Sequence, residues 1–389
     1  MAGGPRPGRA AADLGYLRDY NEALVLGVVR GLPAFDRAGV AVATGLTPQA
    51  VSKVLARLID QGFVATAGVV RHGVGKPTAT YRVVPASRYA IGAHVGRGDL
   101  RLVLADFTGD VLASEVTELP ADFTPAQLLR ALESGRAALV RAHQLAPARI
   151  AGMGVGMVGP LDHARGIVRD AHRLQHWHDV PLRELAEAAL GLPVHLDKDV
   201  TAGVTGEAWR RGAELRHAVL IMVQSGIGAG LWLDGAAYRG AHTNAGEFGH
   251  TVIELDGPPC VCGRRGCLEI VHDTAAAAGD LSRACRVLST GIVNLLQTVD
   301  VDHVILAGTD LFHHADQYLH EVRRAVRTEV PRADWLPVEV SLSALGEDAI
   351  AAGAAMQVLN ARFGLPVREA AGPGAAARPG TVPEAVPSG

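Results

Sequence analysis

The stretch His242–Glu269, HTNAGEFGHTVIELDGPPCVCGRRGCLE, decides how this chain of 389 residues is interpreted. Three of the four cysteines in the chain, Cys260, Cys262 and Cys267, fall within eight residues of this stretch, and His250 lies ten residues before the first of them. Three thiolates and one imidazole form a tetrahedral ligand set that suits Zn2+. The alternatives are a disulfide or chance clustering, and a disulfide fits poorly with a chain that has one other cysteine and no export signal. The spacing therefore predicts a structural zinc site.

The same stretch resembles a known family. Gly-Glu-Phe-Gly-His-Thr, followed by Gly-Pro-Pro-Cys-Val-Cys-Gly-Arg-Arg-Gly-Cys-Leu-Glu, is similar to the signature of the ROK family of repressors, open reading frames and sugar kinases. In that family the histidine binds both zinc and sugar, and the two glutamates hydrogen-bond sugar hydroxyls. The resemblance, which covers about residues 14–362, implies these roles for His250, Glu247 and Glu269. A Cys3His site leaves no open position for water, which argues against a zinc-dependent hydrolase.

Composition and charge bound the class of protein. The apolar fraction is 48%, yet no apolar run reaches the roughly 18 residues of a membrane span. The first residues lack the apolar segment of a secretory signal, so we expect a cytoplasmic protein without membrane contact. Residues 1–88 hold 11 Lys and Arg against 5 Asp and Glu, or +6, which leaves −9 for the rest. A basic front end on an acidic body favours nucleic-acid binding.

We expect residues 1–13 to be disordered. The pattern that follows predicts a winged helix-turn-helix over residues 14–86. An amphipathic helix over 14–30 precedes a short helix that Asp36 caps, and Thr47 with Pro48 opens the next helix. Strands over 63–70 and 78–84 flank a basic loop that would be the wing. The alternative is a three-helix module that binds protein or merely packs. The buried face of the third helix is predicted to hold Val51, Val54, Leu55, Leu58 and Ile59.

The expected partner of this unit is operator DNA. A helix-turn-helix presents the first turns of its second helix to the major groove, and dimers read near-palindromic sites. We therefore expect a homodimer or a dimer of dimers. The predicted phosphate contacts are Lys53, Arg57, Arg71 and Lys76. The predicted base-edge contacts are Thr47, Gln49 and Ser52, with Lys53 as a further candidate.

The rest of the chain resembles the sugar-kinase body of the ROK family, a two-lobed actin-like ATPase (RNase H-like) fold. Three short strands, a helix and a further strand over 89–155, followed by a loop over 156–160, match the first lobe. The fold class is thus α+β and α/β, with an effector domain over 87–364 and a disordered tail over 365–389. Lobe 1 would cover about 87–196 plus a closing helix over 345–362, and lobe 2 about 197–344. The expected elements of the second part are strands over 218–223, 228–233 and 304–307, helices over 274–298 and from 316, and a closing helix within 343–359.

The phosphate-binding motif of the kinases is degraded. The family motif Asp-x-Gly-Gly-Thr-Lys appears as His94-Val95-Gly96-Arg97-Gly98-Asp99, so a carboxylate and a close backbone approach are lost. Gln224-Ser225-Gly226-Ile227-Gly228 keeps more of the second loop, Gly-Thr-Gly-Ile-Gly. Ala307-Gly308-Thr309 keeps less of the Gly-Gly that the family places near adenine. ATP and Mg2+ are therefore not expected as cofactors, and no catalytic residue is expected.

The base position of the kinases survives as Asp199, within Lys198-Asp199-Val200-Thr201, where the family has Asn-Asp-Ala-Asn. A solvated loop carboxylate is the alternative for this residue. One family sugar contact, an asparagine before Asp199, has no evident counterpart, and His172, Arg173 or Gln175 are candidates to replace it. Arg173 would also suit a phosphorylated sugar. The predicted sugar site comprises Asp199, Glu247, His250, Glu269 and Gly159, with Gly156 also allowing close backbone approach.

The predicted function is that of a sugar-responsive DNA-binding transcriptional regulator, expected to be a repressor. Its degenerate kinase domain would bind a sugar or sugar phosphate and thereby alter operator binding. The alternative is an active ATP-dependent ROK sugar kinase that also carries a DNA-binding domain.

Overall fold

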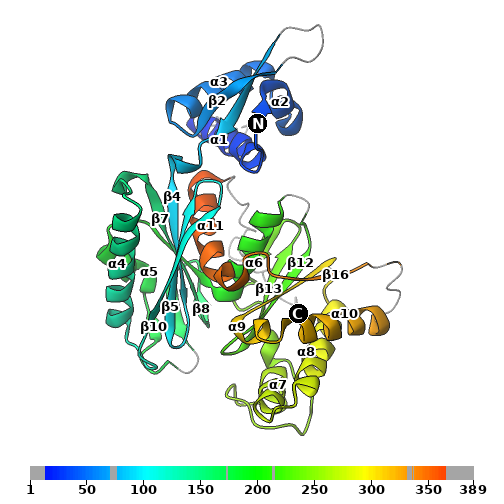
Figure 1. Ribbon diagram of the computed structural model, residues 1–389. Helices are drawn as coiled ribbons and strands as arrows, with labels where there is room; N and C mark the ends of the chain where they lie inside the picture. The colour runs from blue at the N-terminus through cyan, green and yellow to red at the C-terminus, as the bar shows by residue number, and fades with distance from the viewer. Residues whose placement is uncertain are drawn as a thin grey trace, which may run out of the picture.

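The computed structural model describes residues 14–70, 77–171, 174–212, 215–330, 335 and 337–364. It shows a small N-terminal unit above two larger lobes (Figure 1). Both segments predicted to be disordered, 1–13 and 365–389, lie outside the described residues, as do the wing residues 71–76. Among the helices of the described part, none is long and apolar enough to cross a membrane.

The N-terminal unit packs three helices against a three-stranded sheet of order β1-β3-β2. The predicted caps are confirmed, since an Asp36 carboxylate oxygen accepts the Gly39 N–H at 2.7 Å and the Thr47 hydroxyl accepts the Ala50 N–H at 3.3 Å. The buried face of α3 is as predicted except at Ile59, which is 37% exposed because it lies at the edge of the apolar stripe. The elements are α1 (Leu14–Val29), β1 (Phe35–Asp36), α2 (Arg37–Thr44), α3 (Pro48–Asp60), β2 (Val64–Val70) and β3 (Thr78–Val83).

Lobe 1 is built on a five-stranded sheet of order β11-β7-β4-β5-β6. Strands β4, β5 and β6 form an antiparallel meander. Strand β7 pairs with β4 in parallel, and β11 pairs with β7 in parallel. Helices α4 and α5 cover one face and α11 covers the other (Figure 1). The small sheet β10-β9-β8 lies beside it. The elements are β4 (Tyr89–Val95), β5 (Asp99–Asp106), β6 (Val111–Glu118), α4 (Pro125–Ala142), β7 (Ile150–Met157), β8 (Leu161–Asp162), β9 (Ile167–Asp170), β10 (His178–Val180), α5 (Leu182–Leu190), β11 (Val194–Lys198) and α11 (Ala349–Phe363).

Lobe 2 repeats this design with a sheet of order β14-β13-β12-β15-β16. Helices α7, α8 and α10 pack on one face, and α6 packs on the other, where it also meets α11. The two lobes are therefore joined through this helix pair, α6 with α11. The elements are α6 (Asp199–Arg211), β12 (Ala218–Val223), β13 (Ile227–Leu233), β14 (Ala236–Tyr238), α7 (Leu268–Ala277), α8 (Leu281–Leu296), β15 (His303–Ala307), α9 (Thr309–Phe312), α10 (Ala315–Glu329) and β16 (Glu339–Leu342).

Three predicted boundaries are wrong. Gly156 and Met157 belong to β7 rather than to a loop, because both pair with residues of β4 and β11. Gly156 also allows α11 to approach, since a Cβ there would lie 2.7 Å from a methyl carbon of Ile350. Helix α7 begins at Leu268, directly after Cys267, and not near 274. The closing helix begins at Ala349 rather than at 343 or 345. Helix α6, which follows the motif around Asp199, was not predicted.

The N-terminal unit shares a hydrophobic core with lobe 1. Phe63 at the end of the helical part, Phe107 after β5 and Phe363 at the end of α11 form a cluster with ring centroids 5.0–5.3 Å apart. Apolar residues of α1 and α3 belong to the same cluster of buried side chains as the last turns of α11. The junction is therefore a packed interface.

Candidate functional site

A cleft of about 810 Å3, including the part open to solvent, lies between the two lobes. Four of the residues predicted from sequence, Asp199, Glu247, His250 and Glu269, line this one cleft although they are up to 70 positions apart. Gly159 lines it too, whereas Gly156 does not and serves helix packing instead. The remaining walls come from the turn after β4, the start of α6 and the turn between β12 and β13.

Asp199 is the first residue of α6. One of its carboxylate oxygens accepts the Val200 N–H at 2.7 Å. Burial, with a smaller contribution from the nearby Glu247, raises the pKa of this carboxyl to about 6 against the opposing effects of the Val200 hydrogen bond and the charges of Lys198 and Arg97. A carboxyl with a pKa near 6 can both donate and accept hydrogen bonds close to neutral pH.

Lys198 forms an ion pair with Glu247 inside the cleft. Its Nζ lies 2.5 Å from Glu247 Oε1 and 3.0 Å from the carbonyl oxygen of Ala245, and its side chain is only 5% exposed. The lysine therefore neutralises one of the predicted sugar carboxylates and joins lobe 1 to lobe 2. The sequence showed that lysine replaces the family's asparagine at this position, but not which group would receive its charge.

Glu269 lies in the first turn of α7 and is nearly buried. Its Oε2 accepts the Ile227 N–H at 2.9 Å, so it fixes the turn between β12 and β13. A carboxylate near a helix N-terminus is also stabilised by the helix dipole. This residue thus shapes the floor of the cleft while presenting carboxylate oxygens to it.

Arg97 crosses the cleft from lobe 1 to lobe 2. Its Nη1 donates a hydrogen bond to the carbonyl oxygen of Ser225, in the turn that corresponds to the second phosphate loop of the kinases. His94, at the end of β4, is buried, and burial together with Arg101 lowers the pKa of this imidazole to about 4. A neutral imidazole therefore stands where the kinase motif has a carboxylate. Gly98 does not line the cleft.

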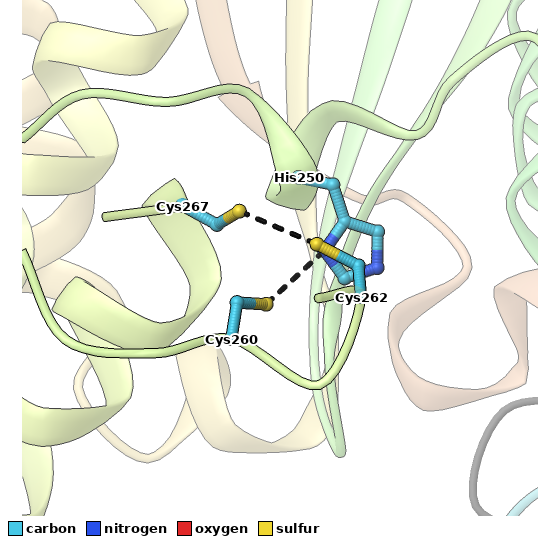
Figure 2. Close-up of side chains that lie close together, drawn as sticks. All are labelled: His250, Cys260, Cys262 and Cys267. Carbon is cyan, nitrogen blue, oxygen red and sulfur yellow. Dashed lines mark hydrogen bonds between the residues drawn. The ribbon is translucent and has the colours of Figure 1, made fainter. Parts of the chain in front are cut away.

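The four predicted metal ligands converge on one point (Figure 2). Their ligand atoms all lie within 4.8 Å of one another. The sulfurs of Cys262 and Cys267 are 3.6 Å apart, and so are Cys260 Sγ and His250 Nδ1. A tetrahedral ion with bonds of about 2.3 Å to sulfur separates two thiolates by about 3.8 Å, so the set fits a bound metal ion.

A second polar cluster lies outside the cleft lining and was not predicted from the sequence. It brings His163 and His195 close to Asp197, which is fully buried. Asp197 accepts hydrogen bonds from its neighbour's N–H, from Arg239 at 2.7 and 3.0 Å and from Gln357 at 2.7 Å. Because these donors satisfy both oxygens, the cluster ties β11, lobe 2 and α11 together. The signal in the sequence that could have indicated this cluster is Asp197 itself, an acidic residue at the end of a predominantly apolar segment.

Other predicted contacts lie elsewhere. Gln175 does not line the cleft, and its N–H donates to Asp122 at 3.2 Å. His172 and Arg173 lie outside the described residues. Gly308 also does not line the cleft. It takes a positive φ of 111°, and a Cβ there would lie 2.0 Å from the Val223 carbonyl oxygen, so both the backbone conformation and the space favour glycine.

The predicted DNA contacts gather on α3. Thr47, Gln49 and Lys53 are exposed, and Ser52 is half-buried beside them. Arg57 differs, because its Nε lies 2.5 Å from a carboxylate oxygen of Glu22 in α1. Its guanidinium thus links two helices. The wing residues Arg71 and Lys76 lie outside the described part of the chain.

Comparison with known proteins places this geometry in a family. The sequence model of the ROK family matches residues 90–280. The xylose repressor of Caldicellulosiruptor bescii is 25% identical over 392 residues, covering 90% of this chain and 98% of the relative. The glucokinase of Thermotoga maritima is 32% identical over 186 residues, which cover 46% of this chain and 57% of the enzyme.

A solved structure gives the same result for the fold. The structure described as a ROK family transcriptional regulator, a homologue of the E. coli MLC protein, superposes with a TM-score of 0.72 at 22% identity, covering 90% of this chain and 98% of that one. It confirms the predicted two-lobed fold, which ROK glucokinase structures also share. Residues 90–280 of this chain therefore form a ROK family domain, and the chain has the fold that regulators and sugar kinases of this family have in common.

Proposed function

We propose that this protein is a sugar-responsive DNA-binding transcriptional regulator, a repressor whose effector lobes bind a sugar or sugar phosphate without phosphorylating it. One observation carries the proposal: the cleft unites the sugar-binding residue types of the family while Arg97 spans the place of the phosphate loops. The family resemblance to xylose repressors over nearly the whole chain supports the regulatory role.

Recognition of the sugar would rest on Asp199, Glu247, Glu269 and His250. Carboxylates and an imidazole accept or exchange hydrogen bonds with vicinal hydroxyls, and a site built of such groups rejects ligands that lack them. Gly159 leaves room for close approach of the ring. The Lys198–Glu247 ion pair would fix the carboxylate of Glu247, so that its remaining acceptor sites face the ligand.

Features of the same cleft support the proposed lack of phosphoryl transfer. Transfer needs backbone N–H groups against the phosphates and a metal ion to neutralise their charge. Here the Arg97 side chain lies over the turn that holds Ser225, where phosphates would sit. His94 is uncharged at neutral pH and supplies no oxygen ligand, although Mg2+ strongly prefers oxygen.

The metal ion that suits His250, Cys260, Cys262 and Cys267 is Zn2+, bound structurally. Thiolates and imidazole select zinc over Mg2+ or Ca2+, and four protein ligands close the coordination sphere. The ion would hold the loop that carries Val261 against the cleft. His250 Nδ1 faces the cysteines, and the same residue lines the cleft.

The N-terminal unit would be a winged helix-turn-helix that reads operator DNA with α3. Thr47, Gln49, Ser52 and Lys53 would face the major groove, with the predicted wing over the adjacent backbone. Arg57 would reach a phosphate only by leaving Glu22. Two such units in a homodimer, or a dimer of dimers, would bind a near-palindromic site, and the protein would act in the cytoplasm.

The first test is a thermal-shift screen of the full-length protein against aldoses and their phosphates, with and without ATP and Mg2+. A ligand that binds the folded state raises its melting temperature, by an amount that grows with concentration relative to Kd. We expect a shift with a sugar or sugar phosphate and none with ATP. Absence of a shift with every sugar would contradict the proposed ligand class.

A second candidate is an ATP-dependent sugar kinase that also binds DNA. Asp199 favours it, since a carboxyl with a pKa of about 6 lies in the cleft where the kinases place their base. A coupled assay of ADP release with the sugars that give a thermal shift distinguishes the two. Turnover that is lost in Asp199→Asn would establish the kinase, while its absence supports the regulator.

A further inference from the structure

Arg30 occupies an unusual place at the junction between the N-terminal unit and lobe 1. It directly follows α1, and its N–H donates to the Leu26 carbonyl at 3.0 Å. Its guanidinium carbon lies 4.2 Å from the ring centroid of Trp209 and 5.2 Å from that of Phe107. Within the described part of the chain, the buried Nε and Nη2 have no hydrogen-bond partner. Aromatic faces are thus the main partners of this cation.

Such a contact is sensitive to small displacements. Two buried guanidinium nitrogens without hydrogen bonds are unfavourable, and burial lowers the pKa of Arg30 to about 10. Cation–π attraction compensates only while the cation stays within about 6 Å of the ring. If Trp209 moves away, Arg30 gains more from hydration than from staying buried. The junction can therefore exist in a closed and a hydrated arrangement.

Trp209 is held firmly by lobe 1. Its Nε1 donates to the Thr108 carbonyl at 2.8 Å, and a Cβ on Gly109 would lie only 2.3 Å from the same nitrogen. The neighbouring Arg210 pairs with Asp110 at 3.2 Å. The ring therefore follows the end of α6 and the turn between β5 and β6 as one body.

The same helix starts in the cleft. Asp199 is its first residue, and Trp209 follows ten residues later, which is about 15 Å along an α-helix. All residues from Val200 to Ala208 are buried. The backbone of α6 touches its neighbours without intervening side chains, since a Cβ on Gly353 would lie 1.8 Å from the Ala202 carbonyl. A helix packed in this way moves as a rigid element.

Helix α11 runs alongside and connects the same two places. Ile350 in its first turn lines the cleft, and Phe363 at its end packs on Phe63 of the N-terminal unit at 5.2 Å. Figure 1 shows α11 leading from between the lobes towards that unit. Two helices packed on each other thus begin at the cleft and end at the junction.

We propose that Arg30 and Trp209 form the coupling contact through which occupancy of the cleft sets the position of the DNA-binding unit. Sugar binding at Asp199 displaces α6 along or about its axis, and Trp209 carries this displacement to Arg30. The N-terminal unit then exchanges between the closed and the hydrated arrangement, which changes the spacing of its two copies on DNA. The inference rests on the proposed function, because it needs both a sugar and DNA.

The test measures coupling separately from binding. DNA fragments that the full-length wild-type protein retains from sheared host DNA at about 0.15 M salt serve as the DNA probe. The sugar probes are D-glucose and D-xylose and their 6- and 5-phosphates. The coupling ratio is the fold-change that sugar causes in the Kd for DNA, taken as the larger Kd divided by the smaller one. We expect a ratio of at least about 5 for the wild type.

Arg30→Met and Trp209→Leu are expected to bind DNA and sugar individually within about 3-fold of wild type, with coupling ratios below about 2-fold. Arg30→Lys keeps a cation over the ring and should retain most of the coupling. Arg88→Met is the matched control, because Arg88 stacks on Phe63 at 4.7 Å at the same junction but not on α6. It should couple as the wild type does.

Hydrogen exchange of the full-length protein provides a second measurement. In the wild type, sugar should change protection at residues 26–32 and 205–211, and Arg30→Met should abolish the change at 26–32 alone. Unchanged coupling in both Arg30→Met and Trp209→Leu overturns the inference and leaves the regulator intact. A wild-type ratio of one with every sugar that binds overturns the proposed function, and the inference with it.

Discussion

At the scale of single residues, the cleft balances three carboxylates against two cations. Lys198 pairs with Glu247, and Arg97 reaches the turn behind Glu269. Asp199 lacks so close a cation, and burial raises its pKa to about 6. The charged form of Asp199 is therefore unfavourable in the cleft, and a sugar hydroxyl that donates a hydrogen bond to this carboxylate would stabilise it.

The first prediction concerns this carboxyl. Its pKa is about 6 in the folded chain against its usual 3.8, so the folded state binds an extra proton between about pH 4 and pH 6. Stability therefore falls as pH rises through this window and stays lower above it. Asp199→Asn removes this dependence and should be more stable than the wild type at pH 7 by roughly 1–2 kcal/mol, with little difference at pH 4.

Urea unfolding from pH 4 to pH 8 measures the difference, with Asp300→Asn, a change at an exposed carboxyl, as the control. A gap between Asp199→Asn and wild type that does not grow with pH would contradict the raised pKa of this carboxyl. The variant should also lose the sugar-induced thermal shift.

The second prediction concerns the metal. Cys262→Ser replaces a thiolate with a poor zinc ligand, and we expect the metal content of the purified protein to fall from one zinc per chain to less than half. Cys285→Ser changes a buried cysteine of α8 outside the cluster and should leave the metal content unchanged. Elemental analysis with a thiol count gives both numbers, and equal zinc in the two variants would exclude the assigned ligand set.

At the scale of elements, the α6–α11 pair depends on glycine. A Cβ on Gly353 would overlap the Ala202 carbonyl oxygen, and one on Gly206 would lie 2.9 Å from the Cα of Gly353. Backbone therefore packs directly on backbone, as at other sites where small residues let helices approach closely. The third prediction follows from this.

Gly353→Ala should lower the free energy of unfolding by about 3 kcal/mol or more, because rigid backbone must move. Gly27→Ala is the matched control, since Gly27 also lies within a helix but has no atom within 4 Å of an added Cβ. Because alanine has the higher helix propensity, Gly27→Ala should leave the free energy of unfolding unchanged or raise it by up to about 1 kcal/mol. Chemical unfolding of both variants tests the opposite signs, and equal effects would contradict the packing.

At the scale of the whole molecule, the N-terminal unit and lobe 1 share one core. The cluster of Phe63, Phe107 and Phe363 joins them, so we expect one cooperative unfolding transition for these two parts. A flexibly tethered unit would instead melt alone. The shared core is also what allows a displacement in the lobes to reach α3.

The fourth prediction tests this junction. Phe363→Ala removes a half-buried ring and should destabilise the chain by about 2–3 kcal/mol, less than for a fully buried phenylalanine. It should also split the calorimetric transition, with the N-terminal unit melting first. Leu255→Ala, at a side chain that is 88% exposed, should shift neither midpoint by more than about 0.5 kcal/mol. A single transition in Phe363→Ala would argue against separable units.

The sequence by itself determined the features in which neighbouring residues act together. The ligands of the metal site lie within 18 positions of one another, and the caps at Asp36 and Thr47 act on amides three residues away. The gathering of Asp199 with Glu247 and Glu269 was predictable only through the family motif, because no local rule relates positions so far apart. Local chemistry and a long ordered motif thus carried the prediction of the fold and most of the cleft.

Only the tertiary structure decided the contacts between distant segments. Arg97 meets Ser225 across 128 positions, and Lys198 meets Glu247 across 49. The packing role of Gly156 and the stacking of Arg30 on Trp209 likewise depend on how α11 and α6 sit against the sheets. The physical reason is that charge pairing and close packing depend on distance in space, which the fold sets and which spacing along the chain does not reveal.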